Sequence, residues 1–196
     1  MNSSIFREYD IRGIADEDLT DDVVSDIGLA MGTIFAKKGL KKISIGRDCR
    51  KSSERIFNVL SSSIIKAGIS IVDLGMITTP VLYFSLYGLK IDGGVMITAS
   101  HNPSDYNGFK AAIGKDVLSA AQIQEIKNII RSKSFIQDTN LGTIEELNLI
   151  DIYKKDILKS INLNKKIRIG VDCANTPIGL FAKDIMSDAG CEVYEL

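Results

Sequence analysis

The sequence is poor in three features that would each point to a class of protein: cysteine, an excess of one charge, and long apolar runs. Its 24 Lys and Arg residues are balanced by 25 Asp and Glu residues, so the formal net charge is -1. The chain therefore has no overall positive field that would attract nucleic acid or an anionic membrane. We expect neither partner, and any anion site must be local.

The three cysteines, Cys49, Cys173 and Cys191, are an odd number without the CxxC or Cys/His spacing of a zinc site. This usage is typical of reduced thiols in a cytoplasmic protein. The N-terminus lacks the apolar stretch of a secretory signal, and no segment approaches the roughly 20 apolar residues of a membrane span. The sequence therefore predicts a cytoplasmic location.

Apolar residues recur at helical spacing in segments that alternate with short apolar runs. The expected helices are 20–39, 53–68, 79–88 and 119–131, and the expected strands are 42–46, 69–74, 92–97 and 108–112. Strands alternating with helices indicate a three-layer α/β/α domain with a mixed, mostly parallel sheet.

The pattern weakens over residues 132–148, where 143–147 is a possible edge strand, and a new alternation then begins. Its elements are a helix at 149–161, a strand at 166–171, a helix at 179–190 and a strand at 191–196. We expect one domain over 1–148 and the beginning of a second, similar domain over 149–196. One such unit cannot bury both faces of its sheet, so we expect this chain to be the front of a longer protein.

Reactive side chains are concentrated directly after the strand at 92–97. The segment reads Thr98-Ala99-Ser100-His101-Asn102-Pro103 and continues Tyr106-Asn107-Gly108-Phe109-Lys110. In open α/β sheets, binding sites lie beyond the carboxyl ends of strands. The serine and histidine leave a serine hydrolase open, but the segment lacks the GxSxG elbow and adjacent residues usually point in different directions. Ordinary Ser-His hydrolysis is therefore disfavoured.

Three cations stand at loop or strand-end positions: Arg12, Arg47 and Lys110. The chain has no GxxxxGK[ST] or GxGxxG motif for a nucleotide. A phosphorylated serine carries roughly -1.5 to -2 charges and requires cations and backbone donors around it. Each cation taken singly is more simply a surface charge, but together they favour a phosphate at Ser100.

Three motifs carry a resemblance to a known family. TASHNPSDYNGFK at 98–110, FREYDIRG at 6–13 and GRDCRKSS at 46–53 resemble the α-D-phosphohexomutase superfamily, in particular its bacterial phosphomannomutase/phosphoglucomutase branch. The resemblance implies interconversion of hexose 1-phosphate and hexose 6-phosphate through a phosphoserine and a hexose 1,6-bisphosphate, which also serves as activator. Tyr106 and Phe109 favour the mannose/glucose branch over the phosphoglucosamine branch.

The resemblance also implies roles for individual residues. Ser100 would carry the phosphoryl group, Lys110 and Arg12 would assist proton transfer, and His101 would organise the loop and contact the phosphate rather than act as general base. The substrate-binding residues implied are Tyr9, Arg47, Asn102 and Asn107.

The family's Mg2+ is held by the phosphoserine and three aspartates of a DGDxD loop, which this chain lacks, so Ser100 is its one expected metal ligand. The resemblance also implies that the family's sugar-reading and phosphate-binding domains lie outside these 196 residues. We therefore expect this chain alone to lack mutase activity. A non-catalytic sugar-phosphate binding module remains the main alternative, the serine hydrolase is less favoured, and the oligomeric state is open.

Overall fold

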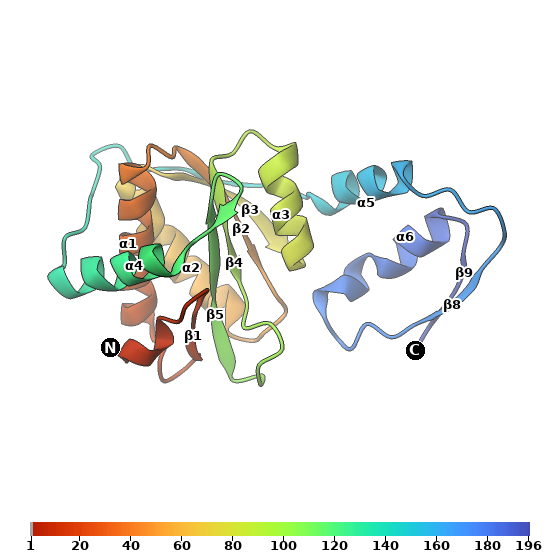
Figure 1. The fold of residues 1–196 in the computed structure, drawn as a ribbon, viewed down its shortest axis with the longest axis horizontal. Helices are drawn as coiled ribbons and strands as arrows, with labels where there is room; N and C mark the ends of the chain where they lie inside the picture. Colours follow the sequence, from red (N-terminus) through yellow and green to blue (C-terminus); the bar gives the residue numbers. More distant parts are fainter. Residues whose placement is uncertain (1) are drawn as a thin grey trace.

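A mixed sheet forms the centre of the molecule in the computed structural model, which describes residues 2–196 (Figure 1). Within that range a 7-stranded sheet has the order β1-β5-β4-β2-β3-β7, and β6 pairs with β5. The strands are β1 (Ile11–Ile14), β2 (Lys42–Arg47), β3 (Ser70–Met76), β4 (Gly93–Ile97), β5 (Tyr106–Ile113), β6 (Asp116–Val117) and β7 (Ile144–Glu146).

The strand directions follow from the connections between them. β2 is parallel to both β3 and β4, and β3 is parallel to β7. Helices connect β2 to β3 and β3 to β4, because strands that run in the same direction need a crossover connection. The short loop 98–105 returns the chain antiparallel, so β5 runs against β4, β1 and β6. The expected mixed, mostly parallel sheet is confirmed.

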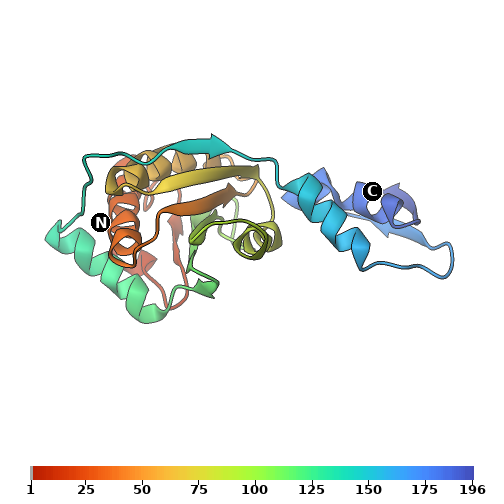
Figure 2. The same ribbon diagram turned by 90° about the horizontal axis from the view of Figure 1, so that it is seen from above.

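Helices cover both faces of the sheet (Figures 1 and 2). Helices α1 (Asp21–Lys37), α2 (Ser53–Ile64) and α4 (Ala120–Ser132) lie on one face, and α3 (Thr79–Gly88) lies on the other. The larger core lies under the first group, where Ile27, Ile34 and Ile56 are buried against the sheet. The helical spacing in the sequence reflects this burial, and the three-layer architecture is confirmed.

The remaining elements lie beyond α3 and comprise α5 (Ile150–Lys159), β8 (Arg168–Val171), a 3-10 helix (Pro177–Leu180), α6 (Ala182–Asp188) and β9 (Glu192–Glu195). β8 and β9 pair in parallel. The ring of Tyr153 meets those of Phe84 and Phe181 edge-on, with centroids 5.3 and 6.0 Å away. These contacts attach the segment to α3, while the domain boundary at 148 stays a prediction.

Two elements differ from the sequence-based expectation. β1 forms in a segment that showed no strand pattern, because its four residues are too short for alternation to be visible and pairing with β5 stabilises it. The helix expected over 179–190 is interrupted at Phe181, whose φ is -150°. The buried Phe181 ring belongs to the core beside α3, so tertiary packing overrides helix continuity there.

Gly108 allows β1 to approach β5. A Cβ at this position would run into the carbonyl oxygen of Ile11 and would lie 3.1 Å from the Cα of Arg12. Backbone atoms on a paired strand cannot move aside without breaking the pairing. The glycine of the Asn-Gly-Phe-Lys segment is therefore a requirement of strand packing.

We expect Gly108→Ala to lower the free energy of unfolding by about 2 kcal/mol, the usual cost of forcing an extra group into a packed site. Gly88→Ala is the matched control, because its Cβ would make an ordinary 3.6 Å contact with Phe84 at the end of α3. Alanine there should be neutral or slightly stabilising. Urea denaturation of both variants measures the difference, and equal stabilities would contradict the packing argument.

Candidate functional site

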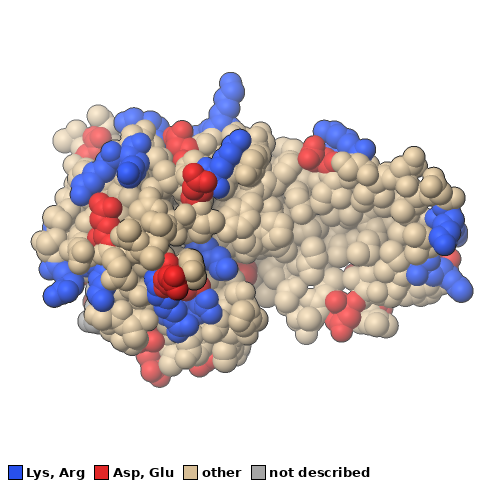
Figure 3. Space-filling view, viewed as in Figure 1, with Lys and Arg blue, Asp and Glu red and all other residues tan. Residues whose placement is uncertain are grey.

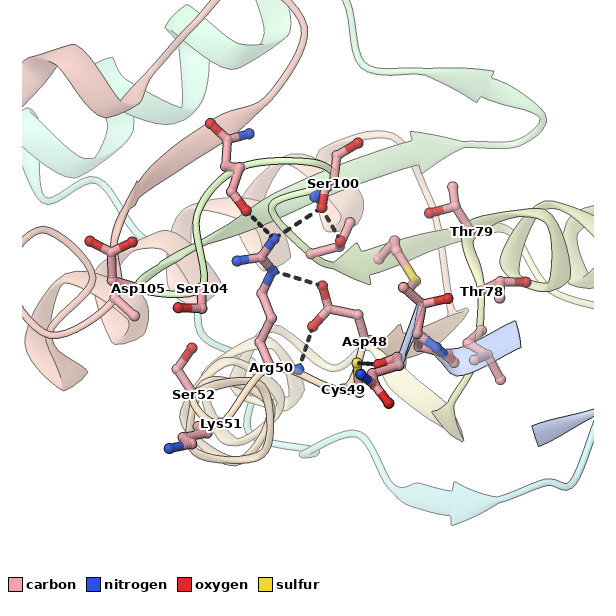
Figure 4. Close-up of a pocket in the computed structure, with 18 of the residues that line it drawn as sticks. Asp48, Cys49, Arg50, Lys51, Ser52, Thr78, Thr79, Ser100, Ser104 and Asp105 are labelled. Carbon is pink, nitrogen blue, oxygen red and sulfur yellow. Dashed lines mark hydrogen bonds and ion pairs between the residues drawn. The ribbon is translucent and has the colours of Figure 1, made fainter. Parts of the chain in front are cut away.

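An open cleft of about 920 Å³ lies where β2, β3 and β4 end (Figure 4). The carboxyl ends of parallel strands share one edge of a sheet, which is where α/β proteins bind ligands. The walls come from the loops after β1, β2 and β4, the beginning of α2, the residues after β3 and a turn before α6. The lining residues include Asp16, Asp48, Arg50, Thr78, Ser100 and Asn175.

Ser100 is exposed in the loop between β4 and β5 and has a left-handed backbone, with φ 57°. This conformation costs a non-glycine residue about 1 kcal/mol and persists only where the surroundings impose it. The Ser100 N–H donates to Thr98 Oγ1 at 2.9 Å, and its carbonyl accepts from Arg50 at 2.9 Å. Both sides of the residue are therefore fixed while its hydroxyl lies at the cleft.

Arg50 is the residue that sequence reasoning missed. Its guanidinium lies under the Ser100 loop, and the side chain is only 13% exposed (Figure 4). It donates to the backbone carbonyls of Ser100 (2.9 Å), Asn102 (2.7 Å), Tyr106 (3.0 Å) and Pro103. Arg50 belongs to the GRDCRKSS motif, which carries the available signal, but the family resemblance points to Arg47 of that motif and not to Arg50.

The two asparagines both hold backbone. The Asn102 side chain donates to the Ala99 carbonyl at 2.7 Å and lines the cleft. Asn107 is fully buried on the α2 side, where its amide donates to the hydroxyls of Ser52 at 2.9 Å and Ser53 at 3.0 Å. Its side-chain oxygen accepts the N–H of the next residue at 2.8 Å. Asn107 thus ties β5 to the beginning of α2 and does not line the cleft.

Arg12 and Lys110 project from the same face of adjacent strands. Arg12 lies opposite Gly108 in the register, and Lys110 lies two residues further along β5, opposite Met96. Side chains two residues apart share a face, and this is the α3 side. Arg12 pairs with Asp10, and its buried Nε has no hydrogen-bond partner within residues 2–196. The strand register therefore brings both cations together near the base of the Ser100 loop, outside the cleft lining.

Arg47 is occupied by contacts within the protein. Its guanidinium pairs with Asp73 at 2.6 Å and with Glu54 at 2.7 Å, and it lies 4.3 Å from the centre of the Phe57 ring. The side chain is 14% exposed, and Arg47 is not among the residues that line the cleft. The expected substrate contact therefore has no direct support from its position.

Tyr9 and His101 are both exposed. The pKa of Tyr9 is raised first by the hydrogen bond that its hydroxyl donates to the Glu8 carboxylate and then by the negative charge of that carboxylate; Tyr9 does not line the cleft. His101 Nδ1 lies 3.4 Å from Ser100 Oγ, which is too long for a strong hydrogen bond. In the part of the chain that the structure describes, no carboxylate or amide orients the His101 ring, so a hydrolytic triad is not assembled.

Carboxylates near Ser100 do not form a metal site. Across residues 2–196, no three His, Cys, Asp or Glu side chains gather in a way that could hold a metal ion. Asp48 accepts from Ser53 Oγ at 2.6 Å and from Arg50 Nε at 3.2 Å, so its oxygens are already engaged.

Among residues 2–196, no helix has the length and apolar character needed to cross a bilayer. Charges of both signs are interspersed over the face in Figure 3.

The backbone strain at Ser100 yields a stability test. We expect the free energy of unfolding of Ser100→Gly to exceed that of Ser100→Ala by about 0.5–1 kcal/mol, because glycine adopts positive φ without a Cβ clash. Urea denaturation of the two variants measures this difference. The control is Ser62, an exposed residue inside α2, where alanine should be the more stable of the two by about 1 kcal/mol. The same order of stability at both sites would contradict an imposed left-handed conformation at Ser100.

The sequence is similar to a known protein family and to named members of it. The family described as "Phosphoglucomutase/phosphomannomutase, alpha/beta/alpha domain I" matches residues 3–137. The chain is 39% identical over its whole length to the phosphoglucomutase of Neisseria gonorrhoeae and covers 43% of that protein. It is 38% identical to the phosphomannomutase/phosphoglucomutase of Pseudomonas putida, again over its whole length, and covers 42% of it.

A solved structure agrees with the sequence comparison. All of this chain superimposes on 44% of a phosphoglucomutase/phosphomannomutase family protein from Burkholderia thailandensis, with a TM-score of 0.94 and 33% identity. The chain thus spans less than half the length of these relatives. The matched residues include the β1–β5 pairing, Ser100 and Arg50. The chain belongs to the phosphoglucomutase/phosphomannomutase family.

Proposed function

We propose that this chain is the phosphoryl-carrying part of a phosphohexomutase, which interconverts hexose 1-phosphate and hexose 6-phosphate of mannose, glucose or both. One observation carries the proposal: Ser100 stands exposed at the cleft with a left-handed backbone that is hydrogen-bonded to Thr98 and Arg50. Relatives named phosphoglucomutase and phosphomannomutase/phosphoglucomutase support it. Strain at a rigidly held nucleophile is common at functional sites.

In this mechanism Ser100 Oγ is a covalent carrier. The bond between phosphorus and Ser100 Oγ breaks as a sugar hydroxyl oxygen bonds to phosphorus; the sugar hydroxyl gives its proton to a base, and Ser100 Oγ takes up a proton as it leaves. The resulting hexose 1,6-bisphosphate reorients and returns its other phosphoryl group to Ser100, with the proton moving back. Splitting one transfer between distant oxygens into two steps is the gain from covalent catalysis. The steps depend chiefly on positioning and on charge neutralisation.

Arg12 and Lys110 are proposed to assist the proton transfers. Their common face on β1 and β5 supports this, as does the buried Arg12 Nε that lacks a partner within residues 2–196. A buried donor is normally satisfied, and an oxygen of a phosphate or a sugar would satisfy this one. His101 is proposed to contact the phosphate, while Asn102 and Asn107 hold the loop. Tyr9 and Arg47 stay predictions as substrate contacts.

The residues present do not fit a complete Mg2+ site. A phosphate oxygen on Ser100 would be one ligand, whereas Mg2+ demands near-octahedral oxygen coordination, usually with one or two carboxylates. The Asp48 carboxylate is committed to Arg50 and Ser53. We therefore assign no step of the reaction to a metal held by this chain. A dependence on Mg2+ remains a proposal for the longer enzyme.

The activity test uses a fused enzyme, in which this chain replaces the matching 43% of the Neisseria gonorrhoeae relative. With glucose 1-phosphate or mannose 1-phosphate and the matching hexose 1,6-bisphosphate, Ser100→Ala should lower kcat by about a thousandfold or more, since it removes the nucleophile. Ser62→Ala, at an exposed position of α2, should leave kcat unchanged. The fused enzyme should also carry phosphate on Ser100 by mass spectrometry.

Three results would contradict the proposal. Retained turnover in Ser100→Ala would remove the carrier role. Tight hexose phosphate binding without turnover in the folded wild-type fusion would favour a non-catalytic binding module. Labelling of Ser100 by a fluorophosphonate probe, with no phosphate on it, would favour a hydrolase. The unfused chain should show no appreciable turnover.

A further inference from the structure

Every N–H of the Arg50 guanidinium is used within the protein. A guanidinium has five donors. Nε donates to Asp48 at 3.2 Å, one terminal nitrogen donates to the carbonyls of Pro103 and Tyr106, and the other donates to those of Ser100 and Asn102. No donor remains for a phosphate or a sugar. Arg50 is therefore suited to hold the loop rather than to bind the ligand.

Converging carbonyls determine where the loop's N–H groups point. In a planar trans peptide the C=O and the following N–H point in opposite directions. The Ser100 carbonyl accepts a hydrogen bond from Arg50, so the following N–H, that of His101, points away from the guanidinium. The Pro103 carbonyl also accepts from Arg50, so the Ser104 N–H points away from it too. Within residues 2–196 neither N–H donates to another group. Backbone N–H groups presented in this way can bind an anion.

The Arg50 side chain is itself held in place by Asp48, on the side away from the Ser100 loop. The Asp48 carboxylate accepts the Arg50 backbone N–H at 3.1 Å as well as its Nε, and it accepts Ser53 Oγ at 2.6 Å. Asn107 bonds the same Ser53 hydroxyl at 3.0 Å. The loop after β2, the beginning of α2 and the loop after β4 therefore form one hydrogen-bonded unit. A buried arginine is stable only when its donors are satisfied in this way.

We propose that Arg50 is a positioning residue for phosphoryl transfer: it imposes the left-handed backbone of Ser100 and turns the His101 N–H toward a phosphoryl group on the serine. The inference rests on the proposed function. Lysine cannot substitute, because its compact ammonium offers three donors around one point, whereas the carbonyls surround a planar fork. A misplacement of about 1 Å at a reacting group can cost about a hundredfold in rate.

In the fused enzyme, we expect Arg50→Lys to lower kcat by about a hundredfold while KM for the hexose phosphate changes less than about threefold. A residue that bound substrate would raise KM instead. Arg131→Lys is the control for the same change of side chain. Arg131 is exposed in the last turn of α4 and is not among the residues that line the cleft. Its kcat should stay within about threefold of wild type.

Two further measurements separate positioning from general stability. Free guanidinium ion should partly restore kcat to the Arg50→Ala fusion and should not restore it to Ser100→Ala. In the 196-residue chain, Arg50→Lys should lose hydrogen-exchange protection at the amides of Asn102 and Tyr106, which bond within the loop. Protection in α1 should be retained.

The outcomes distinguish the two proposals. Turnover that survives Ser100→Ala would overturn the proposed function. If Ser100→Ala is inactive but Arg50→Lys keeps the wild-type kcat and the wild-type hydrogen-exchange protection, only the positioning role of Arg50 is overturned. A raised KM with unchanged kcat would make Arg50 a binding residue and also overturn it. If Arg50→Lys and Arg50→Ala both fail to fold, Arg50 is a stability residue and the inference is wrong.

Discussion

The antiparallel pairing of β5 with β4 is the constraint on which the rest of the site depends. The chain leaves the parallel part of the sheet at Ile97 and returns at Tyr106, so the Ser100 loop stands at the carboxyl edge. The same strand then inserts between β4 and β1 and alternates its side chains between two faces. Asn107 and Phe109 point to the α2 side, while Lys110 points to the α3 side beside Arg12.

Burial of charge explains why this site needs so many hydrogen bonds. Arg47 and Arg50 are 14% and 13% exposed, and each has carboxylate partners. Removing a guanidinium from water is costly unless its donors are satisfied, so such residues order the backbone around them. Arg47 meets this requirement with side chains, and Arg50 meets it chiefly with carbonyls. This difference separates a residue that supports β2 from one that shapes the loop carrying Ser100.

The cleft also depends on the segment beyond α3. The turn before α6 has positive φ at Ala174 and Asn175, 47° and 53°, and reaches the loop after β2. There Cys49 donates its thiol hydrogen to the Asn175 carbonyl at 3.4 Å. The apolar contacts of Phe181 and Leu149 beside α3 hold this segment against the first sheet. The edge of the sheet that carries Ser100 is therefore shaped by contacts between residues far apart in the sequence.

Local sequence alone determined the helices from α1 to α4, the parallel strands β2, β3 and β4, and the position of Ser100, because amphipathic periodicity and a polar loop after an apolar strand are visible within short windows. The family resemblance rested on the same kind of local motif. Tertiary structure decided which arginine of GRDCRKSS serves the loop, that Asn107 is buried, and that Gly108 must lack a side chain. Each of these depends on strand register and on contacts between loops about 50 residues apart, from Arg50 to Ser100. Such contacts arise only when the sheet assembles, so no local pattern could have revealed them.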